Sequence, residues 1–401
     1  MVSVGRHPNI KLLSYSEVEA VSGYVGNYTV RVHRKARYVD ETLCAACGKC
    51  AEVCPVDVNN PFDAGLSKRK AIYRNSAQAV PGAFAIEKRG VAPCRSACPT
   101  DQRAEGYIAL IRQRRYADAY WAIRREHPFP SVCGRVCNHP CEKDCTRGQV
   151  DQPVNIMALK RFVADCAYAH KDELPNMRDK SLIGTPFMHH PKPSGKKVAI
   201  IGAGPAGLAA AYQLRLRGHG VTIFDEHEEL GGMMRYGIPG FRTPREVLDA
   251  EIQRILDLGV QTRLKTRIGS DITMEEIRKQ YDAVFLGMGA QGGRPLPLAD
   301  AQAPNVVTAT SFLKAFNDGR LRHVGKRVVV VGGGDTSIDV ATVARRLGAI
   351  EHAKPTDFEG AIAGHMASDV AHVSAKQGAE VTRTSVFPVD KRQANKHEIE
   401  Q

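Results

Sequence analysis

Residues 196–226 read KKVAIIGAGPAGLAAAYQLRLRGHGVTIFDE, and this stretch decides the fold. The apolar run at 198–201 predicts a buried strand, and the glycine-rich turn after it leads into a small-residue helix at 208–217. A second strand is expected at 221–224, where it ends in two acidic residues. This order of strand, tight turn, helix and strand is the context that a GxGxxG dinucleotide-binding fingerprint requires. We therefore predict a Rossmann-type α/β domain around this stretch.

The three glycines of the fingerprint are Gly202, Gly204 and Gly207. They are expected to allow the turn, to let the backbone approach a pyrophosphate and to bring helix and strand together. Unpaired N–H groups at the start of the helix would face the phosphates. Asp225 lies 18 residues after Gly207, where a carboxylate can accept hydrogen bonds from ribose hydroxyls. Pro205, Ala206 and Glu226 complete the predicted site.

A second fingerprint occupies residues 327–348, RVVVVGGGDTSIDVATVARRLG. Four valines precede Gly332, and Ser337 stands where the third glycine of the motif would be, a substitution frequent in nicotinamide sites. The predicted contacts are Gly332, Gly334, Asp335, Thr336 and Ser337. Two fingerprints in one chain favour one FAD and one NAD(P)H over a single cofactor.

Cys44, Cys47, Cys50 and Cys54 form a CxxCxxCxxxCP run, which is the iron–sulfur spacing of bacterial ferredoxins. In two-cluster ferredoxins the fourth cysteine serves the other cluster, so Cys54 need not share iron with its three neighbours. The alternative, a zinc site, would want two separated CxxC pairs.

Six further cysteines form a second group, Cys94, Cys98, Cys133, Cys137, Cys141 and Cys145. The residues between its two ends include an expected helix at 107–126, so the group is placed on a small helical domain. A disulfide framework fits the count alone, but metal clusters are predicted because the chain reads as cytoplasmic. Cys166, on an expected helix at 159–169, is predicted to be a buried structural thiol.

Composition excludes several classes of protein. The 401 residues are 43% apolar, which is enough for a sizeable core, and no apolar run is long enough to span a bilayer. The N-terminus lacks the layout of a signal peptide. The net charge is +13, but the basic residues are scattered and no nucleic-acid-binding motif accompanies them. The charge therefore predicts a docking face for an acidic redox partner instead.

Residues 84–401 resemble the flavoprotein family of the glutamate synthase small subunit, whose relatives include the N-terminal half of dihydropyrimidine dehydrogenase. The resemblance rests on PCRSACP, CGRVCNHPCEKDC, VAIIGAGPAGLAAA, LGGMMRYGIP and VVVVGGGDTSIDVA. Residues 1–80 are similar to part of heterodisulfide reductase flavoprotein subunits. The family implies that a loop lies against the flavin and that a glycine after the next strand turns past it; the matching residues are Gly231, Gly232, Arg235, Gly237, Ile238 and Gly289.

The chain departs from this family in three places. It lacks the extra CxxC that usually precedes the position of Cys94, and Lys160 stands where some relatives use a Gln ligand. The ten candidate cysteines must then serve two four-iron (4Fe–4S) clusters, or three with some ligands other than cysteine. One cluster is assigned to Cys44, Cys47 and Cys50 and at least one to Cys98, Cys137 and Cys141, with the other four candidates supplying the rest. The chain also ends within the nicotinamide domain, so we expect a fragment or completion by another chain.

The sequence thus predicts a ferredoxin-like segment (1–80), a helical iron–sulfur domain (81–192), an FAD-binding Rossmann domain (193–300) and an incomplete NAD(P)-binding one (301–401). The expected function is a cytoplasmic electron-transfer subunit linking NAD(P)H, FAD and clusters to a ferredoxin-like or catalytic partner subunit. No catalytic acid or base is predicted, since cofactors carry such chemistry. The alternatives are a glutamate synthase-type NADPH reductase and a non-catalytic electron-wire or assembly subunit. Because Ser385, Val386 and Phe387 replace the arginines of NADP-dependent relatives, NADH is the expected nucleotide, although Arg383, Lys391 or Arg392 could reach a phosphate.

Overall fold

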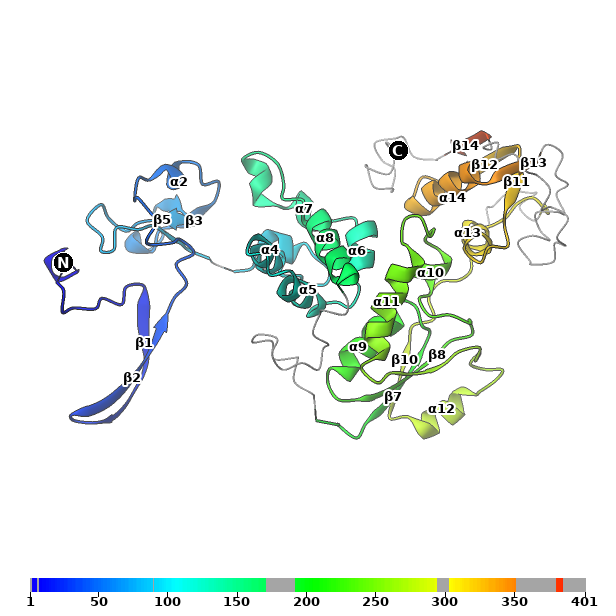
Figure 1. Cartoon of the computed structure of the whole chain (residues 1–401), viewed down its shortest axis with the longest axis horizontal. Helices are drawn as coiled ribbons and strands as arrows, with labels where there is room; N and C mark the ends of the chain where they lie inside the picture. Colours follow the sequence, from blue (N-terminus) through cyan, green and yellow to red (C-terminus); the bar gives the residue numbers. More distant parts are fainter. Residues whose placement is uncertain are drawn as a thin grey trace. The chain divides into compact units, whose positions relative to one another are not determined.

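The computed structural model describes residues 2–5, 7–88, 90–170, 192–293, 303–350 and 380–384 (Figure 1). The chain divides into two compact units. The first combines Met1–Asp101 with Pro140–Asn155, and the second combines Gln102–His139 with Ile156–Gln401. These boundaries differ from the expected ones at 80 and 192, and they place Cys133 and Cys137 in the second unit and the other eight candidate ligands in the first.

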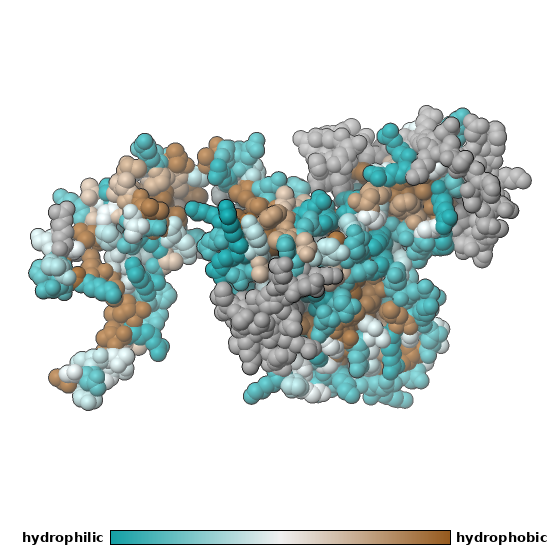
Figure 2. Space-filling view, viewed as in Figure 1, coloured by the Kyte–Doolittle hydropathy of each residue, from teal (hydrophilic) through white to brown (hydrophobic). Residues whose placement is uncertain are grey.

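The first unit begins with a short helix, α1 (Val2–Gly5), and a hairpin of β1 (Ser16–Tyr24) and β2 (Asn27–Arg34). The alternating sequence predicts short strands at 11–13 and 27–33; β2 confirms the second, whereas residues 11–13 form no strand. Cross-strand pairs such as Val18–Val32 and Val21–Val30 put valines on one face of the hairpin, and these side chains stay exposed (Figure 2). Two strands alone bury too little apolar surface to form a core.

The rest of the first unit is built from short elements. Two small antiparallel ladders pair β3 (Asp57–Asn59) with β4 (Lys68–Lys70) and β5 (Ile72–Tyr73) with β6 (Ala85–Ile86). The sequence at 68–80 reads as a linker, but its first six residues include the strands β4 and β5, so that prediction is wrong there. The helical pieces are α2 (Lys49–Glu52), η1 (Pro61–Asp63), α3 (Pro93–Ser96), α7 (Pro140–Lys143) and η2 (Thr146–Gln149).

Four helices open the second unit: α4 (Ala104–Arg112), α5 (Tyr116–Arg124), α6 (Pro130–Val136) and α8 (Ile156–Ala169). The single helix expected at 107–126 is thus two helices, separated where Arg114 adopts a left-handed φ of 58°. Fully buried Ala119, Ile123 and Val163 lie inside this bundle, which confirms the apolar face expected for α5. Cys166 on α8 is only half-buried, not enclosed as expected.

The first fingerprint belongs to a parallel four-stranded sheet of order β10-β7-β8-β9 (Figure 1). Its strands are β7 (Lys197–Ile201), β8 (Gly220–Phe224), β9 (Gln261–Arg263) and β10 (Ala283–Leu286). Leucines and isoleucines of α9 (Pro205–Arg215) and α11 (Arg245–Leu256) pack in one core, and Ile277 of α12 (Met274–Gln280) packs in another. Because neighbouring residues of β7 enter different cores, the helices cover both faces, as expected of a Rossmann-type sheet. A short helix, α10 (Met233–Tyr236), follows β8.

The second fingerprint also adopts the expected strand, turn and helix. β12 (Arg327–Val331) leads into α14 (Asp335–Arg346) and pairs in parallel with β14 (Glu380–Thr384). β11 (His323–Gly325) pairs in parallel with β13 (Gly348–Ile350), and α13 (Ala309–Asn317) shares a core with α14.

Some expectations lie outside the described residues. They are the nucleotide-selecting positions 385–387, Lys391 and Arg392, and most of residues 172–195, which the sequence predicts to be a polar, proline-rich crossing into the flavin domain with His189 and His190 as a solvated loop pair. Within the described ranges no helix is long and apolar enough to cross a membrane.

Candidate cofactor sites

The first fingerprint turn contains two glycines at which an added Cβ would clash with the backbone and one at which it would not. Gly202 has a left-handed φ of 104°, and a Cβ there would lie 2.3 Å from the Gly287 carbonyl oxygen. At Gly207 a Cβ would lie 1.9 Å from the Gly202 carbonyl oxygen. At Gly204, the N-cap of α9, a Cβ would meet nothing nearer than the Gly232 Cα at 3.8 Å. The outer two glycines therefore close the turn, and the middle one leaves room beside the start of α9, where the exposed Pro205 and Ala206 follow.

Asp225 lies at the carboxyl end of β8 and ties the turn to the next loop. Its Oδ2 accepts the Ala203 N–H at 2.6 Å, and its Oδ1 accepts the His227 N–H at 2.8 Å and contacts the His227 ring at 2.8 Å. An ionised carboxylate has about four acceptor positions, so the oxygens retain capacity for ribose hydroxyls. The expected role of Asp225 therefore fits its place, and its contacts hold it rigid.

A cavity of about 340 Å³ opens at the carboxyl ends of these strands. Its lining includes the expected Gly202, Asp225, Glu226 and Gly289. It also includes residues that sequence reasoning missed, namely His227, Thr266, Arg267, Met288 and Gln291. In open α/β sheets ligands bind at this edge, so the cavity and the turn fit the adenosine part of FAD. His227 was identifiable, since it directly follows the two acids.

The loop from Gly231 to Ile238 packs on the fingerprint through its backbone. The Gly231 N–H donates to the Ala203 carbonyl at 2.9 Å. The buried Arg235 donates to the Leu230 carbonyl at 2.6 Å and pairs with Asp249. Gly232 and Gly237 make close backbone approaches to Gly204 and Met233, respectively. These contacts position the loop, and the guanidinium of Arg235 is committed to protein partners.

The second fingerprint repeats this arrangement. Gly332 has a φ of 140°, and a Cβ there would lie 2.3 Å from the Ser337 Oγ. Gly334 is the N-cap of α14, and a Cβ there would meet nothing within 4 Å. Asp335 and Thr336 occupy the first turn of α14. Ser337 therefore does stand opposite the first glycine, as the third glycine does in the other turn.

Two polar contacts link the domains that carry the fingerprints. Arg242 Nη1 lies 2.8 Å from the Oδ1 of the buried Asp339 on α14. Asn317 Nδ2, at the end of α13, donates to the Tyr236 carbonyl at 2.9 Å. Tyr236 belongs to the loop expected at the flavin, and Arg242 follows this loop in the sequence. The loop therefore also contacts the nucleotide domain.

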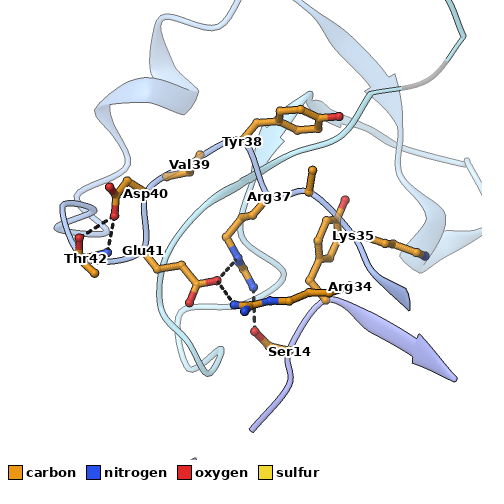
Figure 3. A pocket seen from close by; sticks show the side chains of 11 residues that line it. Ser14, Arg34, Lys35, Arg37, Tyr38, Val39, Asp40, Glu41 and Thr42 are labelled. Carbon is orange, nitrogen blue, oxygen red and sulfur yellow. Dashed lines mark hydrogen bonds and ion pairs between the residues drawn. The ribbon is translucent and has the colours of Figure 1, made fainter. Parts of the chain in front are cut away.

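Arg37 fixes the segment just before Cys44, and Figure 3 shows its contacts with Ser14 and Glu41. Arg37 donates to the Ala83 carbonyl at 3.2 Å and to Ser14 Oγ at 3.0 Å, and its Nε lies 2.7 Å from Glu41. Hydrogen bonds from the Phe84 and Ala46 backbone, with Arg37 nearby, hold the pKa of the Cys44 thiol below its usual range. Cysteine thiolates hold iron–sulfur clusters, and hydrogen bonds to their sulfurs tune the reduction potential, so a lowered thiol pKa is consistent with the expected role of Cys44.

The chain reverses between Cys44 and Cys50 through two left-handed residues, Ala46 (φ 55°) and Gly48 (φ 88°). Cys47 and Cys50 are exposed, whereas Cys44 and Cys54 are half-buried. In the same unit α3 and α7 lie together, which brings the segment of Cys94 and Cys98 next to that of Cys141 and Cys145.

In the second unit Cys133 lies on α6 and Cys137 directly follows that helix. The His139 N–H, turned by a left-handed φ of 38°, donates to Cys137 Sγ at 3.3 Å. Among the described side chains, no three from His, Cys, Asp and Glu converge as they would around a single metal ion. The partition of the cysteines between clusters stays a prediction.

Phe129 and Val132 of the α6 region belong to the same core as Leu208 of α9 and Leu248 of α11. Two buried titratable groups lie at this junction. Burial, with Lys160 and Arg124 nearby, lowers the pKa of His127 to about 3. Burial raises the pKa of Glu251 to about 7, against hydrogen bonds from Ser131.

Three family models match the chain. A 4Fe-4S binding domain covers residues 37–58, the 4Fe-4S cluster domain II of dihydropyrimidine dehydrogenase covers 71–172, and pyridine nucleotide-disulphide oxidoreductase covers 196–388. The chain contains four-iron domains and an FAD- and NAD(P)-binding oxidoreductase domain, which confirms the expected cofactor classes.

Similar curated proteins are oxidoreductase subunits. NADPH-Fe(3+) oxidoreductase subunit beta of Geobacter sulfurreducens is 43% identical over 65% of this chain and 38% of its own length. NADP(+)-dependent formate dehydrogenase subunit beta of Moorella thermoacetica is 41% identical over 69% of this chain and 41% of its own. Glutamate synthase [NADPH] small chain of Mycobacterium tuberculosis is 34% identical over 65% and 54%, respectively.

The chain thus spans about two fifths to about half the length of these relatives. The matched families, the two glycine fingerprints and the cysteine groups agree with one another. The chain thus carries 4Fe-4S domains and a pyridine nucleotide-disulphide oxidoreductase domain, and it is similar to iron–sulfur flavoprotein oxidoreductase subunits such as the glutamate synthase small chain.

Proposed function

We propose that this chain is an electron-transfer subunit in which NAD(P)H on the second fingerprint reduces FAD on the first. The electrons then pass to the iron–sulfur clusters and on to a partner oxidoreductase subunit. The flavin would supply the change from two-electron to one-electron chemistry, and this chain's residues would bind and orient the carriers. The relatives named as beta subunits or small chains support a partner subunit.

The observation that carries the proposal is the position of α6. The helix that precedes Cys137 contributes Val132 to the core formed by α9 and α11 of the flavin domain. A cysteine in a separate domain on a flexible linker would have no fixed relation to the flavin. Here a candidate cluster ligand lies in the same compact unit as the fingerprint turn.

The proposal is tested by anaerobic titration of the reconstituted chain with NADH and, separately, with NADPH. Bleaching of the flavin should be followed by the electron paramagnetic resonance signals of reduced clusters. Flavin reduction without any cluster signal would contradict the electron path, and the absence of both would support the alternative of a non-catalytic assembly subunit.

The choice of nucleotide is decided by the same samples. The sequence predicts NADH, while three relatives carry NADPH or NADP(+) in their names. A missing bidentate arginine–phosphate contact is worth about 2–3 kcal/mol. A tenfold higher specificity constant for NADPH in dye reduction would overturn the NADH prediction.

A further inference from the structure

Glu251 of α11 binds the start of α6 across the junction between flavin domain and helical bundle. It is 3% exposed. Its Oε1 accepts the Ser131 N–H at 2.6 Å and its Oε2 accepts the Val132 N–H at 3.3 Å. Backbone N–H groups in the first turn of a helix have no partner within the helix. A flavin-domain carboxylate therefore supplies the acceptors that α6 lacks.

Besides these two N–H groups, Glu251 receives a hydrogen bond from the Ser131 side chain. Ile252, its neighbour on α11, packs with Phe129 and Val132 in one core, which excludes water. The positive charge of Arg124, which is fully buried, opposes the rise in the pKa of Glu251. Arg124 is itself fixed, because its carbonyl accepts the Tyr212 hydroxyl of α9 at 2.7 Å. Sliding α6 along α11 would leave buried polar groups unpaired.

We propose that Glu251 is a positioning residue for electron transfer between the flavin and the cluster ligated by Cys137. This role rests on the function proposed above. NAD(P)H loses a hydride to the flavin, and the two electrons then leave one at a time, each lowering the charge of one cluster by one unit while flavin protons pass to solvent. Glu251 acts on this second stage by fixing α6, and with it Cys137, on the flavin domain.

Three variants of the full, cofactor-loaded chain test the assignment. Glu251→Ala removes both acceptors, and Glu251→Gln keeps the shape and one acceptor oxygen. Glu246→Ala is the matched control, because Glu246 lies on the same helix and is exposed. Stopped-flow absorbance gives the rate of flavin reduction by NADH or NADPH, and freeze-quench electron paramagnetic resonance gives the rate of cluster reduction.

Glu251→Ala should slow cluster reduction severalfold, because the rate of single-electron transfer falls as the distance between the carriers grows. Flavin reduction by the nucleotide, iron content and flavin content should stay as in wild type. Glu251→Gln should fall between the two, and Glu246→Ala should match wild type. A residue that only stabilises the fold would slow both stages or neither.

Hydrogen–deuterium exchange of α6 provides a readout that does not depend on turnover. The Ser131 and Val132 amides should lose protection in Glu251→Ala and keep it in the control. Unchanged exchange, or equal slowing of flavin and cluster reduction, would overturn the assignment. If Glu251→Ala does not fold, Glu251→Gln decides in the same way. If nucleotide fails to reduce the flavin in wild type, the proposed function fails, while amide exchange still tests the contact.

Discussion

The same substitution at two glycines of one turn should have opposite effects. We consider Gly204→Ala and Gly207→Ala, three residues apart at the start of α9. At 207 the added Cβ would lie 1.9 Å from the Gly202 carbonyl oxygen, so backbone must move. At 204 it would lie 3.8 Å from its nearest neighbour, and the backbone there (φ −75°, ψ −175°) is one that alanine adopts.

The two magnitudes follow from these distances. Overpacking costs about 1–3 kcal/mol, and a clash with a backbone oxygen belongs at the upper end of that range. About 3 kcal/mol corresponds to a fall in melting temperature of roughly 6–12 °C. In contrast, Gly→Ala at a compatible site stabilises a protein by about 0.4–1 kcal/mol, through the unfolded state. The flavin-free Gly204→Ala chain should therefore melt at or slightly above the wild-type temperature.

For the binding of FAD, the larger effect should come from Gly204→Ala. The methyl group at 204 would occupy the space that the middle glycine leaves for the pyrophosphate, so FAD affinity should fall at least about tenfold, or about 1.4 kcal/mol. Calorimetric melting of flavin-free protein and titration with FAD measure the two effects separately. Wild-type affinity in Gly204→Ala, or unchanged melting in Gly207→Ala, would refute this account of the turn.

Three further predictions concern other sites. Cys47→Ser should remove the signal of one cluster but leave the flavin bound, since Cys47 and the fingerprint lie in different compact units; loss of flavin absorbance would contradict this. Because burial lowers the pKa of His127 to about 3, the unfolded chain alone takes up its proton below about pH 6.5. Stability from this site is thus lost as pH falls, by up to about 1.4 kcal/mol per pH unit, and His127→Gln should remove that part of the slope in melting curves between pH 7.5 and 5.5. Arg242→Met should destabilise the chain by about 1–3 kcal/mol, because the buried Asp339 loses its ion pair; Arg320→Met on the surface is the control, and equal melting of both would argue against the link.

The elements that the sequence predicts best are those specified locally. In both fingerprints the strand, the turn and the helix come from one run of apolar residues and glycines, so each was placed correctly to within a few residues. The helix of the first begins at Pro205, three residues before the expected start, because proline suits the first turn of a helix. The break between helices at Arg114 could not be predicted, because no glycine or proline marks it in the sequence.

Elements that depend on distant partners were not predictable in the same way. β4 and β5 are three and two residues long and exist through pairing with other segments, so their sequence alone reads as a linker. Likewise, nothing near Glu251 in the sequence indicates that its hydrogen-bond donors are backbone N–H groups 120 and 119 residues away. Because the donors are backbone N–H groups and not particular side chains, the sequence does not reveal them. The glycines and Asp225 of the flavin site were found from sequence, whereas Thr266 and Gln291 reach the cavity only through the fold.

The contacts between the domains of this chain suit the two kinds of transfer in the proposed function, hydride transfer and single-electron transfer. Hydride transfer requires reacting atoms about 3–3.5 Å apart, so two nucleotide-binding domains must be held in a defined relation. The second unit contains both fingerprints, and the Arg242–Asp339 and Asn317–Tyr236 contacts join their domains. Single electrons pass between carriers without such contact, so clusters tolerate placement in a separate unit, where eight of the ten candidate ligands lie. Cys133 and Cys137 are the exception, and their helix is the one that Glu251 and the flavin-domain core hold in place.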